Sequence, residues 1–207
     1  VKATYFRSQT QDKIILVPAF KPPHREISGP PAKDRLEMAR IAVAPFEPDI
    51  TVSDIEIQRE GISYTVDTLK SFSETYPSEN LFFIMGADAF AGFHTWKNPE
   101  EILKLANVVV TTRPGSELPK QWKEWPENIR SLVKSSRLNK ITLKSGCQII
   151  FVELKDVDVS SSEIRKRLRS GHDATKMLPP SVLTFIKDNK FYERSGPLVK
   201  DYRGFAE

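Results

Sequence analysis

Short apolar runs alternate with segments of helical periodicity along most of the chain. Several runs are apolar at successive positions, which is typical of parallel strands buried on both faces. The pattern predicts strands at 14–17, 51–57, 81–85, 108–112 and 149–154, and helices at 33–44, 65–75, 99–105, 161–169 and 181–189. This alternation predicts an α/β protein with a doubly wound parallel sheet, which binds ligands at the carboxyl ends of its strands.

The clearest helix signal follows the last of these strands. Ser160 and Glu163 have the spacing of a capping box, in which each side chain bonds a backbone amide of the first turn. Ile164 and Leu168 lie four positions apart on one helical face, and Gly171 supplies a stop. The segment therefore predicts a helix that begins abruptly after a strand.

The start of this helix has the features of an anion site. Backbone N–H groups, the positive end of the helix dipole and the hydroxyls of Ser161 and Ser162 would face a ligand there. Arg165 lies about one turn inside the helix, within reach of the same ligand. The three residues predict a polyphosphate site, the alternative being a capped surface helix whose arginines face water.

Composition limits the class of protein. The 207 residues, 39% hydrophobic and 28% charged, suit one globular domain, which we expect at 1–193, followed by a tail at 194–207. With 31 basic and 27 acidic residues the net charge is +4, and the chain has no long Lys/Arg run. Small anionic ligands are therefore favoured over nucleic acid. The sequence leaves open whether the chain forms a homo-oligomer.

Several features that the sequence lacks narrow the class of protein further. A single cysteine forbids an internal disulfide, and the three widely separated histidines have no zinc-ligand spacing. The chain has no run of about 18 apolar residues and no signal-like segment, so neither a membrane span nor secretion is expected. We expect a soluble cytoplasmic protein without a metal bound by its own side chains.

Two segments that follow strands carry groups suited to a phosphate or carboxylate. A loop stiffened by prolines carries three candidate phosphate contacts, Lys21, His24 and Arg25. The alternative is an ordinary surface loop, since such loops often carry cations. The turn at Tyr64 and Thr65 enters a helix and can present amide N–H groups to an anion. A plain helix cap at this turn is the alternative.

Two other strand ends complete the candidate site. Gly86 allows a ligand to approach the backbone closely, and Asp88 has the place of an acid that holds sugar hydroxyls. Trp96 can stack on a planar ring, unless it only packs in the core. Arg113 follows the next strand and adds a second guanidinium. Together with the serine-rich helix, these positions predict a nucleotide site.

In these motifs the chain resembles the bacterial nicotinate-mononucleotide adenylyltransferases of the nucleotidylyltransferase superfamily, over about residues 14–192. The resemblance is carried, in order, by Val17-Pro18, Pro22-Pro23-His24-Arg25, Arg35-Leu36-Glu37-Met38-Ala39, Ser63-Tyr64-Thr65-Val66-Asp67-Thr68-Leu69, Gly86-Ala87-Asp88-Ala89, Trp96, Arg113-Pro114-Gly115, Ser160-Ser161-Ser162-Glu163-Ile164-Arg165 and Leu178-Pro179-Pro180-Ser181-Val182. It implies a Rossmann-like fold and transfer of AMP from ATP to nicotinate mononucleotide, giving deamido-NAD and pyrophosphate in NAD biosynthesis.

The resemblance also implies roles for individual residues. ATP would be bound by Gly86, Asp88, Arg113, Ser161, Ser162 and Arg165, with Arg165 catalytic and Mg²⁺ carried mainly by the phosphates. Nicotinate mononucleotide would be bound by Lys21, His24, Arg25, Tyr64, Thr65 and Trp96. In this assignment the indole packs on the pyridine ring and the Tyr64–Thr65 turn receives the carboxylate.

The chain departs from the family at its start. The family opens with a glycine-rich loop and a His-x-x-His or His-x-Gly-His pair, and nothing in residues 1–13 matches these. We expect that this segment, with a central strand, precedes Val1. The alternatives are a related adenylyltransferase with another acceptor, such as nicotinamide mononucleotide or phosphopantetheine, and a non-catalytic nucleotide-binding relative. A nucleic-acid-binding protein is a third and more distant alternative.

Overall fold

The computed structural model describes residues 2–6, 12–23, 29–112, 121–154 and 160–192. The chain divides into two compact units, Val1–Asp158 and Val159–Glu207, so the division falls between the last strand and the serine-rich helix. Within the described residues, no helix is both long and apolar enough to span a membrane.

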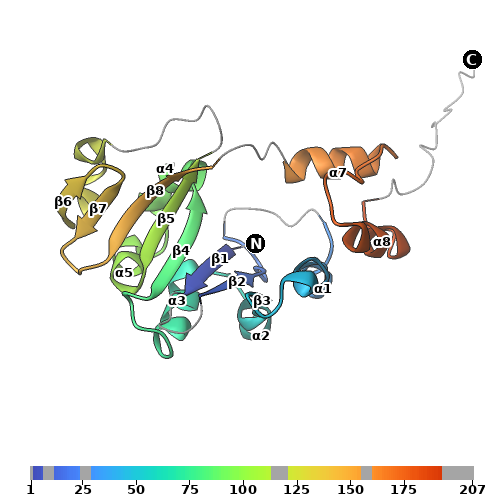
Figure 1. Ribbon diagram of the computed structural model, residues 1–207, viewed down its shortest axis with the longest axis horizontal. Coiled ribbons are helices and arrows are strands. Elements are labelled where there is room, and N and C mark those ends of the chain that lie inside the picture. Colours follow the sequence, from blue (N-terminus) through green and yellow to red (C-terminus); the bar gives the residue numbers. More distant parts are fainter. Residues whose placement is uncertain (1, 7–11, 24–28, 113–120, 155–159, 193–207) are drawn as a thin grey trace, which may run out of the picture. The chain divides into compact units, whose positions relative to one another are not determined.

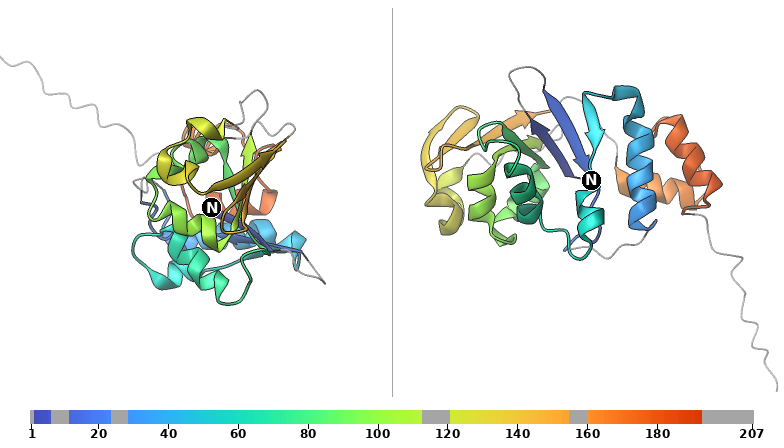
Figure 2. Two further views of the ribbon diagram at one scale, coloured as in Figure 1. Left: turned by 90° about the vertical axis from the view of Figure 1, so that its left-hand side faces the viewer. Right: turned by 90° about the horizontal axis from the view of Figure 1, so that it is seen from below.

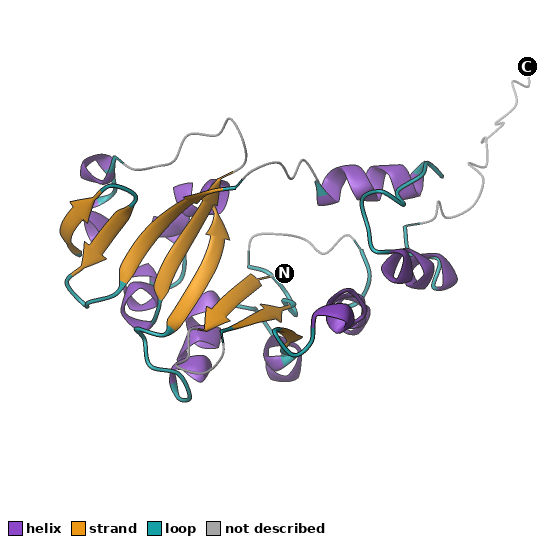
Figure 3. Ribbon diagram, viewed as in Figure 1, coloured by secondary structure: helices purple, strands orange, loops and turns teal. Residues whose placement is uncertain are grey.

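The first unit is built on one eight-stranded sheet (Figures 1 and 3). The strand order is β3-β2-β1-β4-β5-β8-β7-β6. The strands are β1 (Lys2–Phe6), β2 (Lys13–Val17), β3 (Ile50–Val52), β4 (Leu81–Gly86), β5 (Asn107–Thr112), β6 (Val133–Arg137), β7 (Lys140–Leu143) and β8 (Gln148–Glu153).

In the part of the chain that the structure describes, the predicted parallel pairing is found in three of the seven strand pairs, and the other four are antiparallel. β2 pairs in parallel with β3, β4 with β5, and β5 with β8. β1 is antiparallel to both of its neighbours, β2 and β4, so β2 and β4 run in the same direction. The carboxyl ends of β2, β3, β4, β5 and β8 therefore lie along one edge, where an open α/β sheet binds its ligands.

Two parts of the sheet differ from the predicted pattern. The sequence predicted no strand before residue 14, whereas β1 lies between β2 and β4 and runs antiparallel to both. At the other end β6 and β7 form an antiparallel hairpin that pairs with β8. Neither strand of this hairpin was predicted, and β6, with the sequence VKSSR, lacks the apolar run of the strands that were.

The helices of the first unit are α1 (Ala32–Val43), α2 (Ile55–Arg59), α3 (Thr65–Ser73), α4 (Ala87–Ala91), α5 (Pro99–Leu105) and α6 (Glu127–Arg130), with 3₁₀ turns η1 (Ala44–Phe46), η2 (Phe93–Thr95) and η3 (Trp122–Glu124). Figure 2 shows α3 and α5 side by side along one face of the sheet, and the two helices contact each other. Val66 and Leu69 of α3 and Leu103 of α5 are buried there.

The predicted strand at 51–57 is wrong beyond Val52. Residues from Ile55 on form α2, because the amides of Ile57 and Gln58 bond the carbonyl of Asp54 at 2.8 and 2.9 Å. The helix turns Glu56 inward, where its Oε1 accepts a 2.5 Å hydrogen bond from the Thr68 hydroxyl of α3. This contact distant in sequence overrides the strand propensity of the isoleucines.

The core lies mainly on one face of the sheet. Along β4 the side chains alternate, with Leu81, Phe83 and Met85 buried and those between them only partly covered. The prediction of strands fully buried on both faces is thus too strong for β4. The same core contains Cys147, and burial raises the pKa of its thiol.

The second unit is described for residues 160–192 and contains α7 (Ser161–Arg169) and α8 (Pro180–Asp188). The bounds of α7 match the prediction, and Gly171 follows it with φ of +68°, a conformation that favours glycine. Val182, Leu183 and Ile186 of α8 are buried, together with Ala174.

Candidate functional site

The loop after β2 is fixed to the turn before α3. The backbone amide of Ser63 donates to the carbonyl of Lys21 at 2.8 Å, within an isolated parallel bridge between Lys21 and Ile62. The Ser63 hydroxyl oxygen in turn accepts from the amides of Phe20, at 2.8 Å, and Lys21, at 3.4 Å. Two predicted ligand-binding segments, more than 40 positions apart, are therefore held together, with the Lys21 side chain exposed.

Arg35 of α1 supports the same loop. Its Nη1 donates to the carbonyl of Ala19 at 2.7 Å and its Nη2 to that of Phe20 at 2.9 Å. Its Nε also donates to the carbonyl of Pro30, at 3.2 Å. A planar guanidinium offers its donors in a fixed fork, so this one side chain defines the course of the backbone at 19–20. His24 and Arg25, predicted in the same loop, lie outside the described residues.

The Tyr64–Thr65 turn begins α3 without a side-chain cap. Thr65 is the first helical residue, Tyr64 precedes it with extended backbone, and no side chain bonds the amides of this helix start. The plain cap weighed as an alternative is therefore absent, and the Ser63 hydroxyl is used for the loop instead. The start of α3 thus has first-turn N–H groups suited to an anion, as predicted for a carboxylate.

Lys97, the residue after Trp96, contacts this turn. The Lys97 ammonium is 3.1 Å from Asp67 Oδ2 in the first turn of α3, and 4.3 Å from the centre of the Tyr64 ring. The half-buried indole packs edge-on against Phe83, with ring centres 6.2 Å apart, and tilted against Phe93, at 5.5 Å. The core packing weighed as an alternative for Trp96 is therefore present, and its stacking on a ligand ring stays a prediction.

Gly86 and Asp88 occur where β4 runs directly into α4. Gly86 ends the strand and precedes the helix with extended backbone, and Asp88 is exposed in the first helical turn. Among the described residues, no atom lies within 4 Å of the place where a Cβ on Gly86 would sit. The carboxyl end of β4 is thus open, as its predicted ribose contact requires. Arg113, which follows β5, lies outside the described residues.

In the second unit, Arg165 lies back over the start of its own helix. Ser161 and Ser162 are exposed, and Arg165 Nη2 donates to the Ser162 hydroxyl at 3.4 Å. The three groups predicted to hold polyphosphate therefore gather at the first turn of α7. Their helix has nine residues, enough for a developed dipole.

The predicted capping box at α7 is wrong. Ser160 has the extended backbone of an N-cap residue, but no side chain caps the helix. Glu163 instead accepts a 2.9 Å hydrogen bond from Nε of Arg167, one turn further on. An ion pair between residues four apart competes with the reach back to the N-cap amide, and here it prevails.

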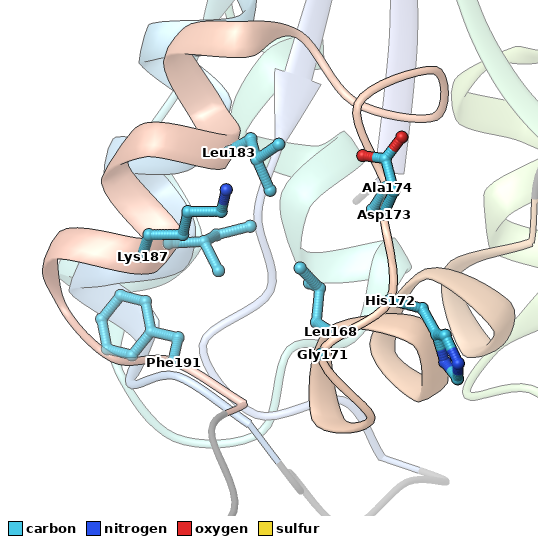
Figure 4. Close-up of a pocket in the computed structure, with 9 residues that line it drawn as sticks. Leu168, Gly171, His172, Asp173, Ala174, Leu183, Lys187 and Phe191 are labelled. Carbon is cyan, nitrogen blue, oxygen red and sulfur yellow. The ribbon is translucent and has the colours of Figure 1, made fainter.

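A cavity of about 530 Å³ lies between the two helices of the second unit (Figure 4). Leu168 of α7 and Leu183 of α8 face each other across it, and the His172 ring is turned away. At its rim, hydrogen bonds from the backbone amide and the hydroxyl of Thr175 lower the pKa of the Asp173 carboxyl. The cavity contains none of the predicted site residues.

The comparisons with known proteins agree with the resemblance. A model of the cytidylyltransferase-like family matches residues 3–167. Proteins named "Probable nicotinate-nucleotide adenylyltransferase" from Pseudomonas syringae pv. tomato and Acidithiobacillus ferrooxidans are 38% and 39% identical over 184 residues. These alignments cover 87% and 86% of this chain and 80% and 81% of the relatives. This chain belongs to the nicotinate-nucleotide adenylyltransferase family.

The fold of the family is found among solved structures as well. A nicotinic acid mononucleotide adenylyltransferase from Plasmodium falciparum, complexed with NaAD, superposes with a TM-score of 0.61. The match covers 87% of this chain and 82% of that one at 18% identity, so it supports the nucleotidyltransferase fold alone. No binding role was predicted for Ser63 or Arg35. Both nevertheless lie in motifs that carry the resemblance to the family.

Proposed function

We propose that this protein transfers AMP from ATP to nicotinate mononucleotide, releasing pyrophosphate and forming deamido-NAD, a step of NAD biosynthesis. The proposal is carried by one observation. Ser63, next to the Tyr64–Thr65 turn, bonds the Lys21 loop, and Lys97, next to Trp96, lies over the Tyr64 ring, so the segments predicted to bind the mononucleotide meet at the start of α3 in a chain of this family.

On the mononucleotide side, each group has a chemical counterpart in the ligand. The uncapped start of α3 at Tyr64 and Thr65 suits the carboxylate of the pyridine ring. The indole of Trp96 suits the ring itself, since aromatic faces stack. Lys21 would approach the phosphate, and so would His24 and Arg25 further along the same loop.

On the ATP side, Gly86 and Asp88 are proposed to bind the ribose. Ser161 and Ser162 are proposed to bind the phosphates at the start of α7, with Arg113 as a further cation. Arg165 is the proposed catalytic residue, because its guanidinium lies over this same turn. A fixed cation there stabilises the negative charge that grows on the leaving pyrophosphate.

The reaction is an in-line displacement. An oxygen of the mononucleotide phosphate forms a bond to the α-phosphorus of ATP, and the bond from that phosphorus to the bridging oxygen of the β-phosphate breaks. The oxygen leaves with the pyrophosphate and keeps the electron pair. Positioning and charge stabilisation supply the rate, so no covalent intermediate with the protein is required.

Mg²⁺ is proposed to arrive with the phosphates of ATP, where it neutralises their charge. Among the described residues, no group of three or more His, Cys, Asp or Glu side chains is arranged to hold a metal ion. Mg²⁺ commonly keeps several waters and binds through substrate phosphates. The proposal therefore assigns it no set of protein ligands.

Both units are proposed to belong to one nucleotidyltransferase domain, 1–193, followed by the tail 194–207. The family match supports this, because it extends past residue 158, where the two compact units divide. The protein is expected to act in the cytoplasm, since its single cysteine suits a reducing compartment.

An acceptor panel tests the proposed function. Protein expressed from its complete reading frame is assayed for pyrophosphate release with ATP and, in turn, nicotinate mononucleotide, nicotinamide mononucleotide and phosphopantetheine. The highest kcat/KM is expected with nicotinate mononucleotide, and deamido-NAD should be recovered as the product. A higher kcat/KM with either other acceptor, or no turnover with any, would refute the assignment.

A further inference from the structure

Ser63 is buried at the junction of two ligand-binding segments. It is 1% exposed, although serine is mostly a surface residue. Its hydroxyl accepts from the amides of Phe20 and Lys21, and its own amide donates to the Lys21 carbonyl. The hydroxyl thus serves the backbone of a loop 42 or 43 positions away, and not the helix that begins two residues later.

Arg35 holds the same stretch of backbone from a third element, α1. The Ser63 hydroxyl accepts hydrogen bonds from the N–H groups of Phe20 and Lys21. The Arg35 guanidinium donates hydrogen bonds to the carbonyls of Ala19 and Phe20. Donors and acceptors of three successive residues are therefore engaged by two side chains. A loop segment without such bonds is among the more mobile parts of a fold, so these hydrogen bonds hold residues 19–21 in one conformation.

We propose that Ser63 and Arg35 are positioning residues for nicotinate mononucleotide: they fix the backbone at 19–21 so that Lys21 and the Tyr64–Thr65 turn address the same ligand. This rests on the proposed function of the site. Neither residue needs to touch the ligand. Ser63 acts through Lys21, and it keeps the loop and the turn in register through the bond between them.

The proposal separates the two substrates. Ser63→Ala leaves the partly buried amides of Phe20 and Lys21 without their acceptor, and the loss of both hydrogen bonds should displace the loop. We expect KM for nicotinate mononucleotide to rise about tenfold, with kcat and KM for ATP within about twofold of the parent values. Ser63→Thr keeps the hydroxyl and should recover most of the loss.

Ser71→Ala is the matched control. Ser71 also lies on α3, but its hydroxyl donates to the carbonyl of Asp67 in the same helix at 3.3 Å and does not reach the loop. Its KM values should stay within about twofold of the parent, because only a local hydrogen bond is lost. A rise in KM for both substrates in Ser63→Ala, or a fall in kcat with unchanged KM, would mark a general structural defect and overturn the proposal.

A double-mutant cycle with Lys21 decides whether Ser63 acts through that residue. Because Lys21→Met removes the side chain that the loop presents, adding Ser63→Ala should then change KM for nicotinate mononucleotide by less than about twofold. Full additivity of the two effects would overturn the proposal. Arg35→Lys, which loses the planar fork, should raise the same KM, and an unchanged KM there would remove Arg35 from the role.

These outcomes are distinct from a failure of the proposed function. If the parent protein does not use nicotinate mononucleotide, the acceptor panel shows it before any variant is made. If the parent uses it and Ser63→Ala has an unchanged KM, the function stands and the positioning role falls. Circular dichroism of each variant confirms that the comparison is between folded proteins.

Discussion

The two regions proposed to bind the substrates are built in different ways. Around Ser63 the contacts join residues 42 and 43 positions apart, so the mononucleotide region depends on the sheet and on α1 and α3 being in place. At the start of α7 the contacts are local, since Arg165 bonds Ser162 three positions away and Arg167 bonds Glu163 four away. One region is a product of the tertiary fold, and the other is a property of a single helix.

This difference suggests how each region responds to substitution. A local helical site loses its ligand contacts when one side chain is removed, with little effect on the fold. A site joined by long-range hydrogen bonds loses geometry when a residue behind it changes, even if the ligand contacts remain.

The largest effect is expected at Arg165. Arg165→Ala should lower kcat about a hundredfold or more, because it removes a cation placed for the leaving pyrophosphate, while the midpoint of thermal unfolding stays unchanged. Steady-state kinetics and circular dichroism measure the two quantities. Arg169→Ala, at an exposed arginine on the same helix, is the control and should keep its kcat. Equal kcat in the two variants would remove Arg165 from the mechanism.

An intermediate effect is expected at Lys97. Lys97→Met removes both the ion pair to Asp67 and the ammonium over the Tyr64 ring, each worth at most about 1 kcal/mol at an exposed site. KM for nicotinate mononucleotide should rise about threefold to tenfold, since the contacts of Lys97 that hold the segment of Trp96 to the turn are lost.

The control for this change is Lys70→Met. Lys70 of α3 makes a similar surface pair with Glu101 at 3.0 Å, but it does not contact Tyr64 or the segment at 96–97. Both variants should lose similar stability in urea unfolding, and only Lys97→Met should alter KM. Equal changes in KM would mean that any surface ion pair on α3 has this effect.

The smallest effect is expected at Ser160. Ser160→Ala should change the free energy of unfolding by less than about 0.3 kcal/mol, because Ser160 does not cap α7, whereas loss of a true capping serine costs about 1 kcal/mol. Urea unfolding followed by circular dichroism measures this. A loss near 1 kcal/mol would show that the capping box forms in solution after all.

The sequence predicted the elements that depend on local pattern. The strands predicted at 81–85, 108–112 and 149–154 match the bounds of β4, β5 and β8 to one residue at each end. The helix α7 begins and ends as predicted. Gly171 marks the end of that helix because a left-handed conformation there favours glycine. These features need little information from elsewhere in the chain.

What the sequence did not predict depends on distant partners. The segment at 55–57 has the residues of a strand, but it folds as α2 with Glu56 bonded to Thr68. β6 is polar, and it forms an edge strand through its pairing with β7. The positions of the candidate site were found from motifs, but the roles of Ser63 and Arg35 were missed, because no local pattern shows which loop a buried hydroxyl or guanidinium will meet.

The backbone at Gly86 has a further consequence. Its φ of −76° is one that every amino acid adopts, and a methyl group there would touch no described atom. Neither the fold nor the crowding of neighbours therefore accounts for a glycine at this strand end. If Gly86 binds the ribose of ATP as proposed, the sugar ring could lie directly against the main chain here without displacing any described side chain.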